Sequence, residues 1–275
     1  MTTGKVKLKI GIVGCGAIGS RIAESIRYDL KKECRLTALY DINHAKAKRL
    51  AQKLGSKKIV KLSLKELIKD CHLMVEAVSA KRTYNIVQQA LKAKRSVLAM
   101  SVGKLLKHPE IFQLAKKNKC HILLPSGAIA GIDAIKAAGL AKIRKITLTT
   151  RKPLSGFRDN AYLTKKGIKI SKIKREIILF KGNVNEAVNL FPQNINVAAT
   201  LALASLSPRK MAVRLMASPT YKKNSHEIEV VGDFGRIYTR TDNVVCPDNP
   251  KTSYLAVLSG IQTLKQFCTG ILIGT

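Results

Sequence analysis

Acidic residues are scarce in this chain of 275 residues. It holds 17 Asp and Glu against 50 Lys and Arg, which gives a formal net charge of +33. Aromatic residues make up only 5% of the chain, and the basic residues are spread along its whole length without a basic tail or an aromatic-rich patch. This pattern favours solvated helix faces over a dedicated nucleic-acid site, and it predicts incidental binding of polyanions at low salt.

Long apolar runs and metal-binding clusters are missing too. No apolar run approaches the roughly 20 residues of a membrane span, so we expect no membrane association. Six widely spaced cysteines form no CxxC motif and no His–Cys cluster, which predicts neither a disulfide framework nor a metal site. The stretch 1–5 leads into a glycine-rich strand and not into the apolar core of a signal peptide, so we expect a cytoplasmic protein.

The most informative motif present is a GxGxxG turn between an apolar run and a helical pattern. In this context Gly14 permits a tight turn, Gly16 lets a pyrophosphate approach the backbone, and Gly19 allows the helix to pack closely on the strand. The first helical turn, with Ala17 and Ile18, offers backbone N–H donors to the anion. The motif therefore predicts a dinucleotide cofactor.

An acidic residue follows at the spacing that such cofactors require. Asp41 lies 22 residues after the last of these glycines and closes the apolar run 36–40, where a carboxylate would meet the ribose hydroxyls of NAD. His44, Lys46 and Lys48 lie close by and could accept a 2′-phosphate, which leaves NADP open as a second cofactor.

Strands and helices alternate through the first 125 residues. This spacing predicts right-handed crossovers and a doubly wound, parallel sheet of the Rossmann type, so the fold class is α/β. We assign 1–125 to a dinucleotide-binding domain. Beyond the first strand, the expected strands of this sheet are 36–40, 72–78, 96–100 and 120–124.

The pattern changes after residue 125. Strand patterns there follow one another with few crossovers, which predicts a second, α+β domain over 126–250 with a mainly antiparallel sheet. We expect an amphipathic helix within 251–275 to pack back on the first domain, and the Lys-rich stretch 153–175 to be a mobile excursion. The expected strands are 144–150, 176–180, 212–216, 227–231 and 236–241.

The second domain carries one candidate for acid–base chemistry. His226 stands where a polar connection enters a strand, so it could act as a general base. The other four histidines fall at helix starts or next to strand starts of the first domain, and such positions are typical of structural or surface residues.

Several motifs beyond the glycine turn resemble, in their order, the L-aspartate dehydrogenase family, and together they span nearly the entire chain. They are PSGAIAGIDAI at 125–135, LTTRKP at 148–153, NINVAATL at 194–201, HEI at 226–228 with GDFG at 232–235, and NPKTSY at 249–254.

The resemblance implies an oxidoreductase that uses NAD, or NADP, to oxidise L-aspartate to iminoaspartate, which hydrolyses to oxaloacetate and ammonia. It also implies a homodimer with a role in NAD biosynthesis. Ala128 and Asn196 match cofactor-contacting positions of the family, and His226 matches its catalytic histidine. The chain departs from the family where Lys104 follows Ser101-Val102-Gly103, because a small residue is usual after that glycine.

The substrate sets the chemistry that the second domain must supply. Aspartate carries two carboxylates, so a cationic pocket is needed, and Arg151, Lys152 and Lys104 are the candidates. We expect the nicotinamide ring held by the N-terminal half to face His226. A histidine with the ordinary pKa of roughly 6.5 would be mostly neutral at pH 7, able to deprotonate the amine or to activate water.

Two alternatives stay open. A related two-domain reductase such as dihydrodipicolinate reductase also has a Pro-Ser-Gly segment, but that family places a histidine pair shortly before it, where this chain has Ile122-Leu123-Leu124. The second alternative is a basic protein that binds NAD or nucleic acid without catalysis. Formation of NADH with L-aspartate, compared with other amino acids, separates all three.

Overall fold

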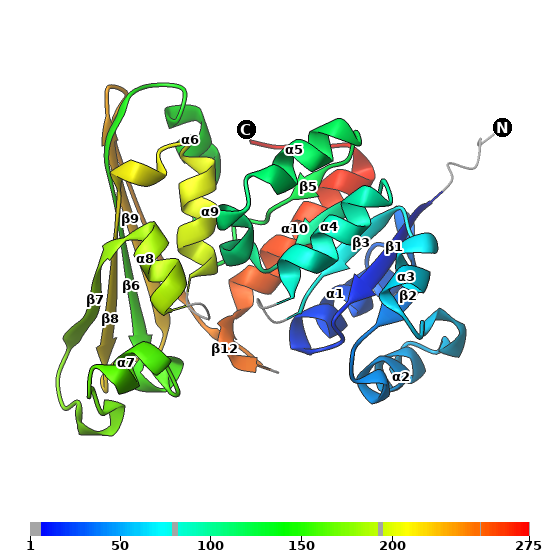
Figure 1. The fold of residues 1–275 in the computed structure, drawn as a ribbon, viewed down its shortest axis with the longest axis horizontal. Coiled ribbons are helices and arrows are strands. Elements are labelled where there is room, and N and C mark those ends of the chain that lie inside the picture. The colour runs from blue at the N-terminus through cyan, green and yellow to red at the C-terminus, as the bar shows by residue number, and fades with distance from the viewer. Residues whose placement is uncertain (1–6, 79–81, 192–194, 248, 275) are drawn as a thin grey trace. The chain divides into compact units, whose positions relative to one another are not determined.

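The structure, a computed structural model, describes residues 7–78, 82–191, 195–247 and 249–274. The chain divides into two compact units (Figure 1). The first unit comprises residues 1–125 and 260–273, and the second comprises residues 126–259 with 274–275. No helix in the described part of the chain has the length and apolar character needed to cross a membrane.

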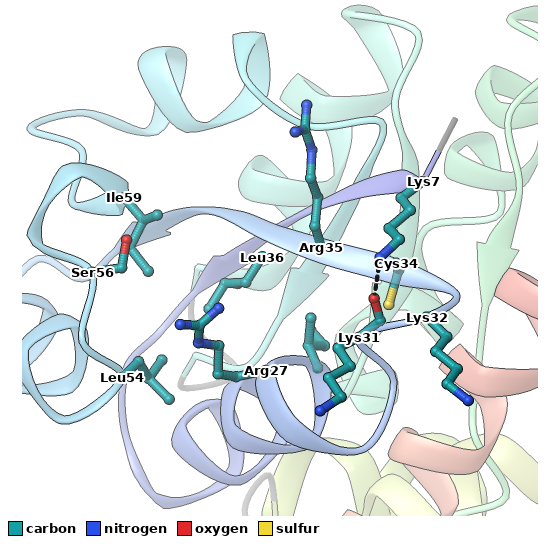
Figure 2. A pocket seen from close by; sticks show the side chains of 11 residues that line it. Lys7, Arg27, Lys31, Lys32, Cys34, Arg35, Leu36, Leu54, Ser56 and Ile59 are labelled. Atoms are coloured by element: carbon teal, nitrogen blue, oxygen red, sulfur yellow. Dashed lines mark hydrogen bonds between the residues drawn. The ribbon is translucent and has the colours of Figure 1, made fainter. Parts of the chain in front are cut away.

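The first unit is built on a parallel sheet of five strands in the order β2-β1-β3-β4-β5. The predicted doubly wound, parallel sheet is therefore confirmed. Lys7 and Cys34 lie at the amino-terminal ends of the first two strands (Figure 2). The strands are β1 (Leu8–Val13), β2 (Cys34–Tyr40), β3 (Leu73–Glu76), β4 (Ser96–Ala99) and β5 (Ile122–Leu123).

Helices connect these strands. The helix after β3 joins β3 to β4, its neighbour in the sheet, as expected of βαβ units. The side chain of Ser63 caps the third of these helices, because it accepts a hydrogen bond from the backbone N–H of Glu66. The helices are α1 (Ala17–Tyr28), α2 (His44–Lys53), α3 (Leu64–Lys69), α4 (Thr83–Lys92) and α5 (Glu110–Lys117), with 3₁₀ turns η1 (Lys57–Ile59) and η2 (Val102–Lys107).

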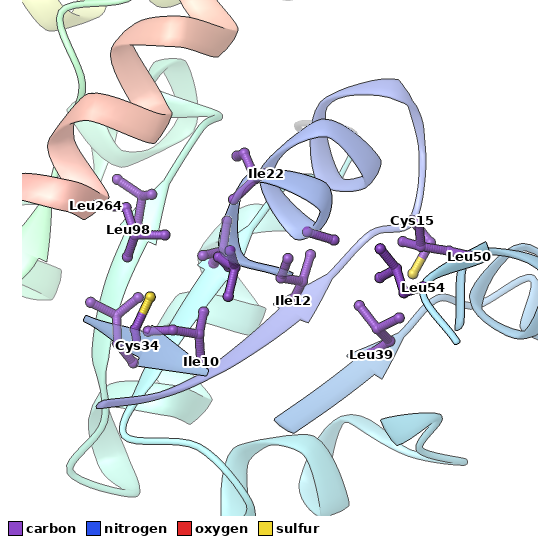
Figure 3. Close-up of a cluster of buried hydrophobic side chains, with 14 of the residues drawn as sticks. Ile10, Ile12, Cys15, Ile22, Cys34, Leu39, Leu50, Leu54, Leu98 and Leu264 are labelled. Atoms are coloured by element: carbon purple, nitrogen blue, oxygen red, sulfur yellow. The ribbon is translucent and has the colours of Figure 1, made fainter. Parts of the chain in front are cut away.

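Each face of the parallel sheet carries its own apolar core, because successive side chains of a strand point to opposite faces. On one face Ile10 and Ile12 of β1 pack with Ile22 of α1 (Figure 3). On the other face Val13 packs with residues of α3, α4 and α5. The last helix, α10 (Tyr254–Thr269), belongs to the first unit from residue 260 onward, and its Leu264 is fully buried in the first of these cores.

The second unit contains a sheet of five strands in the order β10-β9-β6-β8-β7. Three neighbouring pairs are antiparallel, which confirms the mainly antiparallel sheet, whereas β6 and β8 pair in parallel. The long connection between them, which contains β7 and the helices α7, α8 and α9, returns the chain in the same direction. The strands are β6 (Ile143–Pro153), β7 (Ile177–Asn183), β8 (Met211–Ser218), β9 (Asn224–Gly232) and β10 (Gly235–Asn243).

Helices α8 and α9 cover one face of this sheet (Figure 1). The stretch 153–175, which we expected to be a mobile excursion, is anchored by Phe157 and Leu163, both buried, and Phe157 packs edge-on against Phe191. The remaining elements are α6 (Ile132–Ala138), η3 (Leu154–Phe157), α7 (Ala161–Lys165), η4 (Ile170–Lys172), α8 (Val184–Leu190), α9 (Asn196–Ala204), η5 (Pro208–Lys210), β11 (Val245–Cys246) and β12 (Asn249–Ser253).

Candidate active site

The three glycines of the turn after β1 meet different surroundings. A Cβ on Gly14, whose φ is +95°, would lie 2.4 Å from the carbonyl oxygen of Ala77, and one on Gly19 would lie 1.9 Å from the carbonyl oxygen of Gly14. A Cβ on Gly16 would meet no atom within 4 Å. The packing of the protein itself therefore requires two of the glycines, whereas Gly16 borders open space beside the backbone.

This open space adjoins the start of α1. The helix begins at Ala17, so the N–H groups of Ala17, Ile18 and Gly19 belong to the first turn, where no intrahelical acceptor exists and the helix dipole is positive. A phosphate group suits such a position. The residues present thus fit the pyrophosphate of a dinucleotide.

Asp41 is held beside the same turn. One carboxylate oxygen accepts a hydrogen bond from the backbone N–H of Cys15 at 2.7 Å, and the other accepts one from Asn43 at 2.8 Å. Each oxygen has a further lone pair, so these contacts leave acceptors for ribose hydroxyls. The structure thus brings Asp41 and the glycine turn together.

In the second unit, His226 lies inside a strand. We expected it at the entrance of a strand, but β9 begins at Asn224, so His226 takes part in the alternation and faces the buried side of the sheet. Thr150 of β6 lies directly opposite, and its Oγ1 is 2.9 Å from Nδ1 of the imidazole. Nε2 is the ring nitrogen that this bond leaves for other chemistry.

Burial changes the titration of this histidine. Only 3% of His226 is exposed, and this burial, together with the positive charge of Lys152, lowers the pKa of the imidazole to about 3. The expectation of an ordinary pKa near 6.5 was therefore wrong. The ring is neutral at physiological pH, but it holds a proton poorly while no anion is near.

Lys152 lies on the same face of the sheet as Thr150 and His226, two residues further along β6. It is 8% exposed, and burial lowers the pKa of its ammonium to about 8. A carboxylate that approaches raises this pKa again and stabilises the ammonium, because an opposite charge favours the protonated form. The site is thus suited to an anionic ligand.

The other two predicted carboxylate ligands are not on this face of the second sheet. Arg151 alternates to the opposite face of β6 and forms an ion pair with Glu227 at 2.8 Å, so the structure does not bring it together with His226. Lys104 is half-buried in η2 and belongs to the first unit.

The two remaining predicted positions are in the second unit. The carbonyl oxygen of Ala128 accepts hydrogen bonds from Thr241 at 2.8 Å and from the Asn243 amide at 3.0 Å, which ties this loop to β10. Asn196 is the exposed first residue of α9. The structure therefore places Ala128 on a fixed loop and Asn196 at a helix start.

The other four histidines lie in the first unit and contact residues of that unit. Each makes a ring contact or a hydrogen bond within that unit, as expected of structural residues. His44 packs edge-on against Tyr40, His72 accepts the N–H of Lys9, His108 bonds the Glu110 carboxylate, and His121 packs edge-on against Phe267.

Sequence reasoning missed Glu76, the last residue of β3. Its side chain is fully buried and accepts hydrogen bonds from the backbone N–H groups of Val78 and Ser101 and from the hydroxyl of Thr83. Burial raises the pKa of this carboxyl to about 7. A single acid within the apolar run 73–78 was the available signal, because an acid in a buried strand must be compensated by donors.

A basic cavity of about 560 Å³ lies at the amino-terminal ends of β1 and β2. Its basic lining residues are Lys7, Arg27, Lys31, Lys32 and Arg35. Arg35 extends to the opposite side of β2 from Arg27 and Lys31, and the ammonium of Lys7 donates to the carbonyl of Lys31 (Figure 2). The charged groups therefore do not converge on one point.

A parallel sheet with open space beside Gly16 of its glycine turn, and a second unit with a buried imidazole and lysine, are typical of a nicotinamide-dependent dehydrogenase. Two family models match the chain accordingly. Residues 14–125 match the model described as homoserine dehydrogenase, NAD binding domain, and residues 133–267 match aspartate dehydrogenase, C-terminal.

Relatives that match over nearly the whole chain identify the family within this class of dehydrogenases. The L-aspartate dehydrogenase of Methanosarcina mazei is 45% identical over 271 residues, which is 98% of this chain and 100% of that protein, and the Methanosarcina barkeri enzyme is 42% identical with the same coverage. The chain belongs to the L-aspartate dehydrogenase family. The crystal structure of aspartate dehydrogenase from Thermotoga maritima has the same fold, with a TM-score of 0.70 at 22% identity over 97% of this chain and 99% of that chain.

Proposed function

We propose that this protein oxidises L-aspartate to iminoaspartate with a nicotinamide cofactor, and that iminoaspartate then hydrolyses to oxaloacetate and ammonia. Membership of the family supports the reaction. The observation that carries it is the buried pair of His226 and Lys152, because it joins a neutral base to a buried cation whose charge a bound anion would stabilise.

The first unit would hold the cofactor. Gly14, Gly16 and Gly19 with the N–H groups of Ala17 and Ile18 would receive the pyrophosphate. The bound cofactor supplies the acceptor for the hydride that leaves Cα of the substrate.

Asp41 would bind the ribose hydroxyls and thereby favour NAD. The positive charge of Lys46 lies close enough to the glycine turn to act on the thiol of Cys15. A 2′-phosphate bound near Asp41 would therefore also have a cation nearby, which supports NADP as a second cofactor. The ratio of kcat/KM for NAD to that for NADP measures this preference, and Lys46→Gln should raise it.

The second unit would bind substrate and move protons. Lys152 would bind one substrate carboxylate. Burial is the main cause of the low pKa of His226, and the negative charge of the carboxylate would offset the second cause, the repulsion by Lys152, so the imidazole becomes a stronger base when substrate is bound. Nε2 of His226 would then take a proton from the substrate ammonium, release it to solvent, and afterwards accept a proton from the water that adds to the imine. Lys104 is our candidate for the second carboxylate, and Ala128 and Asn196 for further cofactor contacts.

Replacement of the histidine tests this assignment. His226→Ala should lower kcat by at least a hundredfold with L-aspartate and leave the Kd of NADH within about twofold, because a general base contributes 10²–10⁴-fold. Thr150→Val, which removes only the partner of Nδ1, should give a smaller loss. A His226→Ala variant with near-normal turnover would remove His226 from the mechanism.

We further propose that the enzyme is a homodimer that acts in the cytoplasm and supplies iminoaspartate to NAD biosynthesis. The face of the second sheet away from α8 and α9 presents Tyr238 and Ile178, which are 53% and 55% exposed, and these exposed apolar side chains support dimerisation. All six cysteines are free thiols, which supports a reducing compartment. The molar mass in solution, measured by light scattering, tests the dimer.

A further inference from the structure

We propose that Glu76 is a positioning residue for cofactor binding, because its carboxylate ties Val78, which lies against the glycine turn, to Thr83 and to Ser101. This inference rests on the proposed function, since it concerns the nicotinamide cofactor of the same enzyme. Glu76 has no exposed surface, so it acts through the segments that it holds.

Three donors from three segments converge on this one carboxylate. Oε1 accepts from the N–H of Val78, in the loop after β3, at 3.1 Å and from the hydroxyl of Thr83, at the start of α4, at 3.0 Å. Oε2 accepts from the N–H of Ser101, in the loop after β4, at 3.1 Å. The Ser101 hydroxyl also donates to the carbonyl of Val78 at 2.9 Å, which joins the two loops directly.

Ala77 and Val78, which follow β3 directly, lie against the glycine turn. The N–H of Ala77 donates to the carbonyl of Val13 at 2.9 Å. The Ala77 carbonyl and the Val78 side chain are the atoms that a Cβ on Gly14 would strike, at 2.4 and 3.0 Å. A displacement of Val78 would therefore shift the backbone on which the pyrophosphate turn rests.

The topology gives this position its importance. β1 lies between β2 and β3. The strand that follows β1 lies on one side of it and all later strands lie on the other, so the strand order reverses at the boundary of β1 and β3. Open α/β sheets bind their ligands outside the carboxyl ends of the strands at such a switch point. Glu76 is the last residue of β3 and stands at this boundary.

A carboxylate is needed here because both of its oxygen atoms accept hydrogen bonds and neither donates one. Glutamine has nearly the same size, but its NH₂ group would face either the Ser101 N–H or the donors of Val78 and Thr83. Glu76→Gln therefore loses at least one contact and sets donor against donor, while it removes the cost of a buried charge. The substitution disturbs the position of the loops more than the packing of the core.

The matched control is Glu186→Gln in the second unit. Glu186 also accepts a backbone N–H, that of Asn183, at 3.1 Å, in the capping box of α8. Both variants should be compared with the wild type for the KM of NAD, the KM of L-aspartate, kcat, the melting temperature and the Kd of NADH measured by fluorescence.

We expect Glu76→Gln to raise the KM of NAD and the Kd of NADH at least tenfold and to leave the KM of L-aspartate within twofold, with the control unchanged. A folded variant with wild-type NADH affinity, or with both KM values raised equally, would overturn the proposal. If Glu76→Gln does not fold, Thr83→Val removes a single donor, and it should raise the Kd of NADH at least threefold; an unchanged Kd would again overturn the proposal.

The two proposals fail separately in this experiment. A wild type that forms no NADH from L-aspartate would contradict the proposed function, whereas the Kd of NADH in the variants needs no turnover and still decides the role of Glu76.

Discussion

Replacement of Lys152 by methionine should stabilise the fold while it abolishes substrate binding. Burial lowers the pKa of Lys152 from 10.5 to about 8, so at pH 7 the folded chain carries a buried ammonium that the unfolded chain holds in water. Each pKa unit corresponds to about 1.4 kcal/mol, so the cost at pH 7 is about 3 kcal/mol. Methionine has a similar length and no charge, and it escapes this cost.

The pH dependence of this stability gain follows from how many protons the folded and the unfolded chain bind at Lys152. Between pH 8 and 10.5 the unfolded chain binds a proton at Lys152 that the folded chain has lost, so the stability of the wild type rises with pH in this window. Below pH 8 the full cost is present. The gain from Lys152→Met is therefore greatest at and below pH 7 and vanishes above about pH 10.5, and about 3 kcal/mol is its upper limit because the contacts of the ammonium are lost too.

Two measurements check this prediction. The melting temperature at pH 7 should rise by several degrees, since 1 kcal/mol corresponds to about 2–4 °C in a protein of this size class. The KM of L-aspartate should rise at least a hundredfold, and the KM of NAD should stay within twofold. Lys145→Met is the control for stability, because Lys145 is exposed on the same strand, and Arg151→Gln, on the opposite face, should leave the KM of L-aspartate within twofold.

A clear set of results would refute this reasoning. A Lys152→Met protein that is less stable than the wild type would mean that the ammonium is compensated and that its burial carries no cost. A KM for L-aspartate that stays within twofold would remove Lys152 from the substrate site. An equal loss of affinity for substrate in Arg151→Gln would show that general surface charge, not the buried lysine, attracts aspartate.

Two further predictions follow from the same structure. The pKa of His226 is lowered to about 3, so on acidification the unfolded chain binds a proton at His226 before the folded chain does, and stability falls as the pH drops from 6.5 toward 3, by up to about 5 kcal/mol. The urea midpoints at pH 7 and pH 4 should therefore differ less in His226→Gln than in the wild type, and an unchanged difference would contradict the burial of a neutral ring. Gly16→Ala should keep its melting temperature and weaken NADH binding, whereas Gly19→Ala should lower the melting temperature because its Cβ would strike backbone; the opposite pairing would contradict the assigned roles of the two glycines.

The fold of the first unit could be predicted because each local signal agrees with the parallel sheet. Val13 and its neighbours form an apolar run without alternation, as expected of a strand buried on both faces, and the glycine turn fixes where the strand ends and α1 begins. The parallel pairing of β6 with β8 could not be predicted in this way. Alternation shows which residues of a strand share a face, but it carries no information about which strand lies beside it.

Part of the site was within reach of the same reasoning. The predicted strand stopped at Thr150, whereas β6 continues to Pro153, and only within a strand do Arg151 and Lys152 take opposite faces. The low pKa of His226 could not be predicted, because it depends on β9 starting three residues before the predicted strand and on a register that sets the ring opposite Thr150. Burial of a polar residue is a tertiary property.

The buried face of β6 nevertheless shows where the active site would begin. Along that face the side chains are Ile146, Leu148, Thr150 and Lys152, all buried, so an apolar core gives way to a hydroxyl and then to a charge within one strand. A buried charge costs several kcal/mol unless it is compensated, and a fold optimised for stability alone would continue the apolar series. The lysine at the end of this series is therefore best explained by the ligand that it would bind, and a dianion that enters beside it would stabilise the charge of Lys152 and strengthen His226 as a base in the same step.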